Sequence, residues 1–173
     1  MFTTQKISRA LLLFCLFISV ASCGFHLRGS APLSTTDSTI YLTVPRGSFE
    51  QELKDTLFRS GAQFSNDAAS SDYHVDVTYA RLRREIGTLD ERGVVDSYRL
   101  IFTVSYRVFD SKGVIVKSYQ TLNEDRQYAY DPAQIVESEF EEEALRLGME
   151  KDLALRITRQ LSIMANANSL GQN

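Results

Sequence analysis

Residues 98–108 have the sequence Tyr98-Arg-Leu-Ile-Phe-Thr-Val-Ser-Tyr-Arg-Val108, in which a large apolar side chain occupies every second position. This alternation predicts a long β-strand with one buried face, because successive side chains point to opposite sides of a sheet. Asp110-Ser-Lys-Gly113 predicts a hairpin turn, after which residues 114–122 return antiparallel. Asp90-Glu-Arg-Gly93 predicts another turn, ahead of the strand. The stretch therefore belongs to an antiparallel sheet.

A β-α-β unit precedes this hairpin. Residues 39–44 predict a strand, and Ser48-Phe-Glu-Gln51 matches a capping box at the start of an amphipathic helix that Gly61 ends. Residues 73–79 alternate strictly, which places Tyr73, Val75, Val77 and Tyr79 on one face. We expect the two flanking strands to be parallel, with a right-handed crossover.

A long helix is predicted from Asp131-Pro132 to about Ala165, with Asp131 as its N-cap and Pro132 at its first position. Its apolar stripe, which we expect to lie on the sheet, comprises Leu145, Met149, Leu153, Ile157, Leu161 and Met164. Residues 39–165 are thus expected to form one α+β domain. Its order is β-α-β-β-β-α, a four-stranded mixed sheet with two helices packed on it. Residues 166–173 are expected to be a flexible tail.

The amino terminus has the features of an export signal. Lys6 and Arg9 precede an apolar run at residues 10–20, which is too short to span a bilayer. Val20-Ala-Ser-Cys23-Gly24 resembles the bacterial lipobox, which implies cleavage after residue 22 and a lipid on Cys23. Residues 23–38 would then be a lipidated tether. An ordinary signal peptide with an incidental cysteine is the alternative.

Composition and motifs argue against several classes of function. The chain has 19 Lys and Arg against 22 Asp and Glu, without the basic excess typical of proteins that coat nucleic acids. Two His and two Cys leave little for a metal site. A phosphate-binding loop and the common hydrolase motifs are not found in the sequence. His26 lies on the tether, and His74 is expected to face solvent. We therefore expect a non-enzyme without cofactors.

A cluster of arginines is the remaining candidate for binding: Arg81, Arg83 and Arg84, with Arg92, Arg99 and Arg107 in the neighbouring hairpin. Guanidinium groups pair bidentately with phosphate oxygens, so such a group can hold a phosphorylated ligand. The alternative is that these arginines pair with local acids such as Glu85, Asp90 and Asp96.

Cys23-Gly-Phe-His-Leu-Arg-Gly29 closely resembles the mature amino terminus of the LptE family of lipopolysaccharide-assembly lipoproteins, and the predicted order of elements agrees with it. The resemblance implies a non-catalytic protein that plugs the LptD β-barrel, helps it assemble and binds lipopolysaccharide. In bacterial lipoproteins, an Asp directly after the lipidated cysteine keeps the protein in the inner membrane. This chain has Gly24 at that position, so the resemblance implies the periplasmic face of the outer membrane.

The resemblance also implies site residues. A basic residue in the turn that enters the long hairpin binds lipopolysaccharide in the family, and Arg92 occupies that place here. A second basic residue belongs early in the terminal helix, where this chain has Glu137-Ser-Glu139 instead. Arg99 and Arg84 are the candidates to replace it. The alternatives are a generic periplasm-facing lipoprotein of another envelope assembly complex, and a lipid-anchored hydrolase that uses the abundant carboxylates.

Overall fold

The structure is a computed structural model that describes the backbone of residues 38–170 and the side chains of residues 38–167. The predicted signal peptide, Cys23 and nearly all of the tether lie outside the described residues. The elements follow the order β1 (Thr39–Thr43), α2 (Ser48–Arg59), β2 (Gln63–Phe64), η1 (Ala68–Ser70), β3 (Tyr73–Leu89), β4 (Val95–Asp110), β5 (Ile115–Ala129) and α3 (Ile135–Leu170). The predicted α+β class is confirmed.

The sheet has five strands rather than the four expected, in the order β2-β1-β3-β4-β5. The additional strand is β2, whose two residues pair in parallel with β1 directly after α2. A two-residue strand carries no alternation, so the sequence pattern could not reveal it. β1 and β3 are parallel, as predicted, and β3, β4 and β5 form an antiparallel meander.

Helix α2 ends as predicted but does not begin as predicted. Gly61 has a φ of +93°, and its N–H donates to the carbonyl of Phe58, while the Ala62 N–H donates to that of Leu57. This is a Schellman ending. At the other end the capping box does not form, because the N-cap is Gly47, which has no side chain to accept a backbone N–H. Ser48 Oγ donates to Glu150 of α3 instead.

A β-bulge in β3 moves Tyr79 away from the face on which the alternation placed it. The register with β4 shifts between Val77 and Tyr79, so that Tyr79 lies opposite Ser105 rather than beside the core. Tyr79 is 43% exposed, whereas Val77 is buried. The predicted face therefore holds for Tyr73, Val75 and Val77 and is wrong for Tyr79.

Helix α3 is displaced relative to its predicted bounds. It begins at Ile135, because the Asp131 carboxylate accepts the Ala133 N–H within a separate turn that contains Pro132. It continues to Leu170, beyond Ala165 where we expected it to end. The five residues after Ala165 are thus helical rather than part of a tail.

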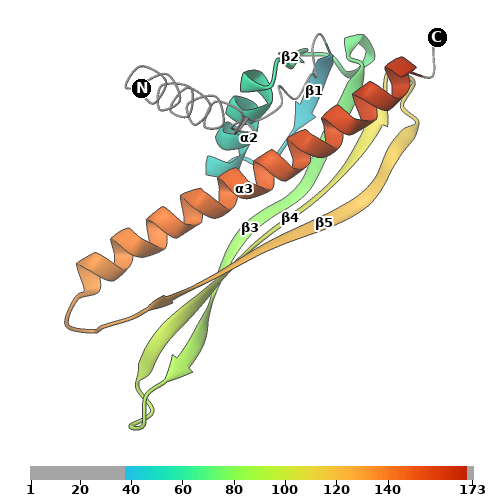
Figure 1. The fold of residues 1–173 in the computed structure, drawn as a ribbon. Coiled ribbons are helices and arrows are strands. Elements are labelled where there is room, and N and C mark those ends of the chain that lie inside the picture. The colour runs from blue at the N-terminus through green and yellow to red at the C-terminus, as the bar shows by residue number, and fades with distance from the viewer. Residues whose placement is uncertain (1–37, 171–173) are drawn as a thin grey trace, which may run out of the picture. The chain divides into compact units, whose positions relative to one another are not determined.

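Both helices lie side by side on one face of the sheet, where they enclose the core (Figure 1). The predicted stripe of α3 faces this core: Met149, Leu153, Ile157 and Leu161 are buried, and Leu145 and Met164 pack at its border. The opposite face of the sheet, called the open face here, carries mainly polar side chains, including Asp76, Thr78, Ser105, Arg107 and Thr121. The turn between β3 and β4 projects beyond the part of the sheet that α3 covers (Figure 1).

Candidate functional site

The β3–β4 turn presents Arg92 on a tightly bonded loop. The Asp90 N–H donates to the Val94 carbonyl at 2.7 Å, and Asp90 Oδ1 accepts the N–H groups of Arg92 and Val94 at 2.9 Å each. Gly93 has a φ of +79°, a conformation that favours glycine. Residue types typical of turns thus hold the backbone on either side of Arg92 in one conformation.

The guanidinium of Arg92 stays accessible although it has a partner. Its Nε and one Nη donate to Asp90 Oδ2 at 3.1 and 2.9 Å, yet 83% of the side chain is exposed. The Val94 N–H, followed by Arg92, holds the pKa of Asp90 below its usual value. An exposed ion pair of this kind contributes little stability, so a phosphate can compete for the guanidinium.

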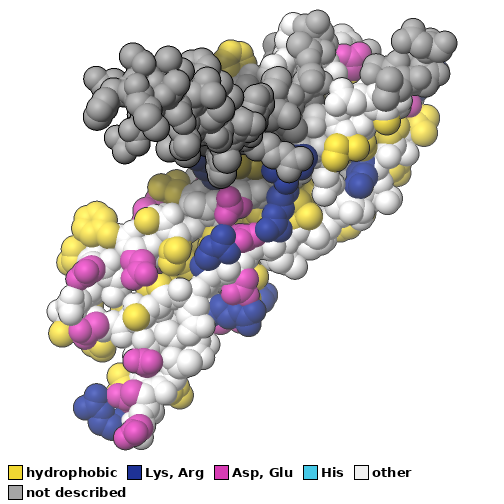
Figure 2. Space-filling view, viewed as in Figure 1, with side chains coloured by type: hydrophobic (Ala, Val, Ile, Leu, Met, Phe, Trp, Pro, Cys, Tyr) yellow, Lys and Arg dark blue, Asp and Glu magenta, His cyan; other side chains and the backbone are white. Residues whose placement is uncertain are grey.

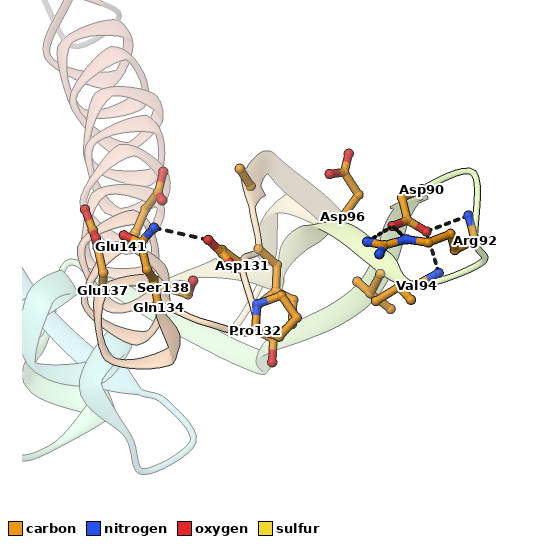
Figure 3. A pocket seen from close by; sticks show the side chains of 13 residues that line it. Asp90, Arg92, Val94, Asp96, Asp131, Pro132, Gln134, Glu137, Ser138 and Glu141 are labelled. Carbon is orange, nitrogen blue, oxygen red and sulfur yellow. Dashed lines mark hydrogen bonds and ion pairs between the residues drawn. The ribbon is translucent and has the colours of Figure 1, made fainter.

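A cavity of about 510 Å³ lies between this turn and the junction of β5 with α3 (Figure 3). Arg92 is the one basic side chain that lines it. The carboxylates that line it are Asp90, Asp96, Asp131, Glu137 and Glu141. Glu137, at the place where the family resemblance implies a basic residue, therefore belongs to the same cavity as Arg92. The predominance of carboxylates disfavours an anion deep in this cavity and favours contact at its Arg92 rim.

Arg99 lies on the open face, in the first third of β4. Its Nε donates to Asp125 Oδ2 of β5 at 2.7 Å, and one Nη donates to the same oxygen. Through this hydrogen bond Asp125 raises the pKa of Arg99, and Arg99 lowers that of Asp125. About half of the Arg99 side chain remains exposed.

Arg84 lies on the opposite side of the sheet, facing α3. Its Nη1 donates to Glu142 Oε2 at 2.9 Å, and its guanidinium carbon lies 4.7 Å from the ring centre of Tyr98. The Tyr128 hydroxyl donates to the same Glu142 oxygen. The hydrogen bond to Glu142 is the largest cause of the raised pKa of Arg84. Arg84 therefore helps to attach the start of α3 to the hairpin.

The structure thus places the three candidate arginines at three separate positions: Arg92 at the turn, Arg99 on the open face and Arg84 beneath α3. The register explains this, because Arg84 pairs with the buried Leu100, whereas Arg99 pairs with Glu85. Of the six arginines, five form ion pairs with described acids, since Arg83 pairs with Glu85 and Arg107 with Asp76.

The sequence did not predict two features around Arg92. The acids of the β5–α3 junction lie in one cavity with Arg92, and no local sequence signal indicates this. Lys112 occupies the same place as Arg92 in the β4–β5 turn, where Asp110 Oδ1 accepts the N–H groups of Lys112 and Val114. The repeated pattern of Asp, two residues, Gly and Val could have revealed the second turn as its match.

His74 is bonded within the open face, where its Nε2 lies 3.0 Å from Thr43 Oγ1 and its ring stacks on Phe109. Within residues 38–170, no group of three or more His, Cys, Asp or Glu side chains is arranged to hold a metal ion. Nor does this part of the chain contain a helix long and apolar enough to cross a membrane.

A comparison with family models matches residues 38–161 to the LptE lipopolysaccharide-assembly family. The chain belongs to the LptE family. The match spans the sheet, α2 and most of α3, which confirms the resemblance drawn from the residues after Cys23. The protein is therefore a lipopolysaccharide-assembly lipoprotein, a member of a non-catalytic family that acts in lipopolysaccharide transport.

Solved structures agree with the membership in LptE. Lipoprotein B from Nitrosomonas europaea is 27% identical, with a TM-score of 0.68 over 75% of this chain and 85% of that chain. A minor lipoprotein from Acinetobacter baumannii is 29% identical, with a TM-score of 0.61 over 73% of this chain and 91% of that chain. The rare lipoprotein B from Shewanella oneidensis, 20% identical over 78% of this chain and 99% of that chain, shares the fold with a TM-score of 0.63. A comparison with curated proteins gave no match.

Proposed function

We propose that this LptE-family lipoprotein occupies the lumen of the LptD β-barrel in the outer membrane, helps that barrel to assemble and contacts lipopolysaccharide on its way to the outer leaflet. The observation that carries the proposal is the family match over residues 38–161, which covers nearly the whole described domain. The role is one of binding, and it needs neither a catalytic group nor a cofactor.

The open face supports the first part of this proposal. Its exposed polar side chains, such as Thr78 and Thr121, suit a water-lined interior. The ion pair of Arg107 with Asp76, at 2.8 Å, also stays partly exposed on this face. A wet, polar interface of this kind can still be stable, because bridging waters replace direct hydrogen bonds.

The lipid on Cys23 would hold the protein at the periplasmic face of the outer membrane, since several acyl chains make the attachment almost permanent. Replacing Cys23 with Ser removes the thiol that accepts the lipid. We expect the Cys23→Ser protein to move from the membrane fraction to the soluble fraction of the periplasm. A variant that stays in the membrane fraction would argue against lipidation.

The barrel partner is tested by purifying a tagged full-length copy in mild detergent and identifying the accompanying proteins by mass. We expect a stoichiometric outer-membrane β-barrel. An intact, folded lipoprotein that brings no barrel with it would contradict the plug and favour a role in another envelope assembly complex.

Lipopolysaccharide contact is tested with Arg92→Glu. The substitution removes the guanidinium that would bind a lipopolysaccharide phosphate and puts a carboxylate, which repels that phosphate, in its place. We expect binding of purified lipopolysaccharide to weaken by about tenfold or more. Lys112→Glu is the matched control, since it makes the same charge change at the same position of the β4–β5 turn. Equal binding by the Arg92→Glu variant and the wild type would remove Arg92 from the site. The same assay on Arg84→Gln and Arg99→Gln tests the two substitutes.

A further inference from the structure

The outer side of α3 carries an apolar stripe that the fold does not use. Val136, Phe140 and Leu147 are 65%, 73% and 50% exposed. Intervals of four and eleven residues return to one face of a helix, because eleven residues make about three turns. The stripe of α3 that packs on the sheet contains Met149 and Leu153 and lies on a different face. The amino-terminal half of α3 is therefore apolar on two faces.

The stripe continues into a shallow depression at the start of the helix. Pro132, Ala133 and Ile135 line this depression together with Val136 and Phe140, and its volume is about 580 Å³. Isolated exposed apolar side chains are ordinary on a protein surface, whereas contiguous ones mark contact sites. We call this surface the α3 patch: Pro132, Ala133, Ile135, Val136, Phe140 and Leu147.

Acidic side chains border the α3 patch. Glu137, Glu139 and Glu141 form no ion pair with any described residue, whereas the neighbouring Glu142 and Glu143 pair with Arg84 and Arg146. Figure 2 shows hydrophobic and acidic side chains together over the amino-terminal end of α3. The helix dipole favours acids in a first turn, but it gives no reason for exposed apolar residues between them.

The acidic side chains beside the α3 patch determine which kind of partner can bind there. An anionic bilayer or the phosphates of a glycolipid would meet unpaired carboxylates and be repelled. A protein surface with an apolar recess and a basic rim would bury the stripe and pair the carboxylates. The charges therefore favour a protein over a lipid.

We propose that the α3 patch is a protein-docking surface, and that its partner presents an apolar recess bordered by Lys and Arg side chains. The proposal rests on the proposed function, because the barrel protein is the partner in which we place this recess. It concerns a surface that adjoins the Arg92 cavity, because Pro132 and Glu137 line both, but that does not include Arg92 itself.

The first test compares the yield of co-purified barrel between tagged full-length variants. Replacing both Val136 and Phe140 with Ser is expected to lower the yield about tenfold, as for truncating apolar anchors of an interface. Glu139→Lys combined with Glu141→Lys is expected to lower it as well. The matched controls are Ile163→Ser, on the same helix, and Phe58→Ser, on α2, both of which are exposed. Circular dichroism checks that every variant is folded.

The outcomes separate the two proposals. Wild-type yield from the patch variants would overturn the docking surface and leave the barrel proposal intact. If the wild type itself brings no barrel, both proposals fail. Equal losses in the patch variants and in Ile163→Ser would also overturn the docking surface, because the effect would not be specific to the patch.

A photo-crosslinker in place of Leu147 tests the chemistry of the partner. We expect it to join this chain to a barrel peptide that contains Lys or Arg close to the crosslinked residue. Crosslinking to lipopolysaccharide or phospholipid alone would overturn the assignment to a protein partner.

Discussion

Ser48 Oγ donates a 2.7 Å hydrogen bond to Oε1 of Glu150, which joins the first turn of α2 to the middle of α3. Arg146 Nη1 donates to both of these oxygens at 2.6 Å. The Glu150 side chain is only 2% exposed, and a buried carboxylate is tolerated when it is paired and hydrogen-bonded. Hydrogen bonding to Glu143, as the largest cause, raises the pKa of Arg146.

We expect Glu150→Ala to lower the free energy of unfolding by about 3 kcal/mol, because Ser48 and Arg146 both lose a buried acceptor. Glu150→Gln should cost less, since its amide oxygen still accepts. Urea unfolding of the full-length protein in detergent measures the difference. Glu141→Ala, at an exposed position of the same helix, is the control. An equal effect of both alanine variants would contradict a structural role for the Glu150 cluster.

Alkaline stability is expected to depend on Tyr106. Burial raises the pKa of its hydroxyl to about 12. The folded protein therefore holds the proton more tightly than the unfolded chain, whose tyrosines titrate near 10. The stabilisation is complete below pH 10 and is lost as the pH rises toward 12.

Tyr106→Phe should make the free energy of unfolding less dependent on pH between 10 and 12, by up to about 3 kcal/mol across that interval. Unfolding curves at several alkaline pH values measure this dependence. Tyr119→Phe is the control, because hydrogen bonding with Thr78 lowers rather than raises the pKa of Tyr119. A Tyr106→Phe protein with the wild-type slope would show that another group controls the alkaline transition.

Asp90 and Asp110 make matching turns at the two ends of β4, so we expect matching effects from their removal. Asp90→Ala deprives the Arg92 and Val94 N–H groups of their acceptor, and Asp110→Ala does the same to Lys112 and Val114. Each variant should lower Tm by a few degrees. Hydrogen exchange should become faster at the Val94 amide in the first and at the Val114 amide in the second. Unchanged exchange would show that the backbone alone maintains these turns.

Gly61 and Gly47 provide a paired test at the ends of α2. Gly61→Ala should destabilise the protein by about 1 kcal/mol, because a φ of +93° is strained for a residue with a Cβ. The backbone of Gly47 is extended and has open space around it, so Gly47→Ala should cost less, about half a kcal/mol, because Ala is a poorer N-cap than Gly. Thermal unfolding of the two variants measures the difference, and equal Tm values would argue against strain at Gly61.

Local patterns predicted most of the secondary structure. The alternation of residues 98–108 predicted β4, Gly61 predicted the end of α2, and the turns at Asp90 and Asp110 were both located. The parallel pairing of β1 with β3 followed from the helix predicted between them, which makes the segment a β-α-β unit. For the candidate site, the sequence could name Arg92, Arg99 and Arg84. The alternation of residues 98–108 placed Arg99 opposite the apolar face, but nothing in the sequence placed Arg84 against α3.

What the sequence determined by itself was the order of elements, the α+β class and the resemblance to the LptE family, because these depend on residues close together in the chain. The tertiary structure alone decided that Tyr79 leaves the core face, that Ser48 bonds to Glu150, and that the acids at the start of α3 lie opposite Arg92. Each of these depends on a partner from another strand or helix, and local periodicity contains no information about that partner.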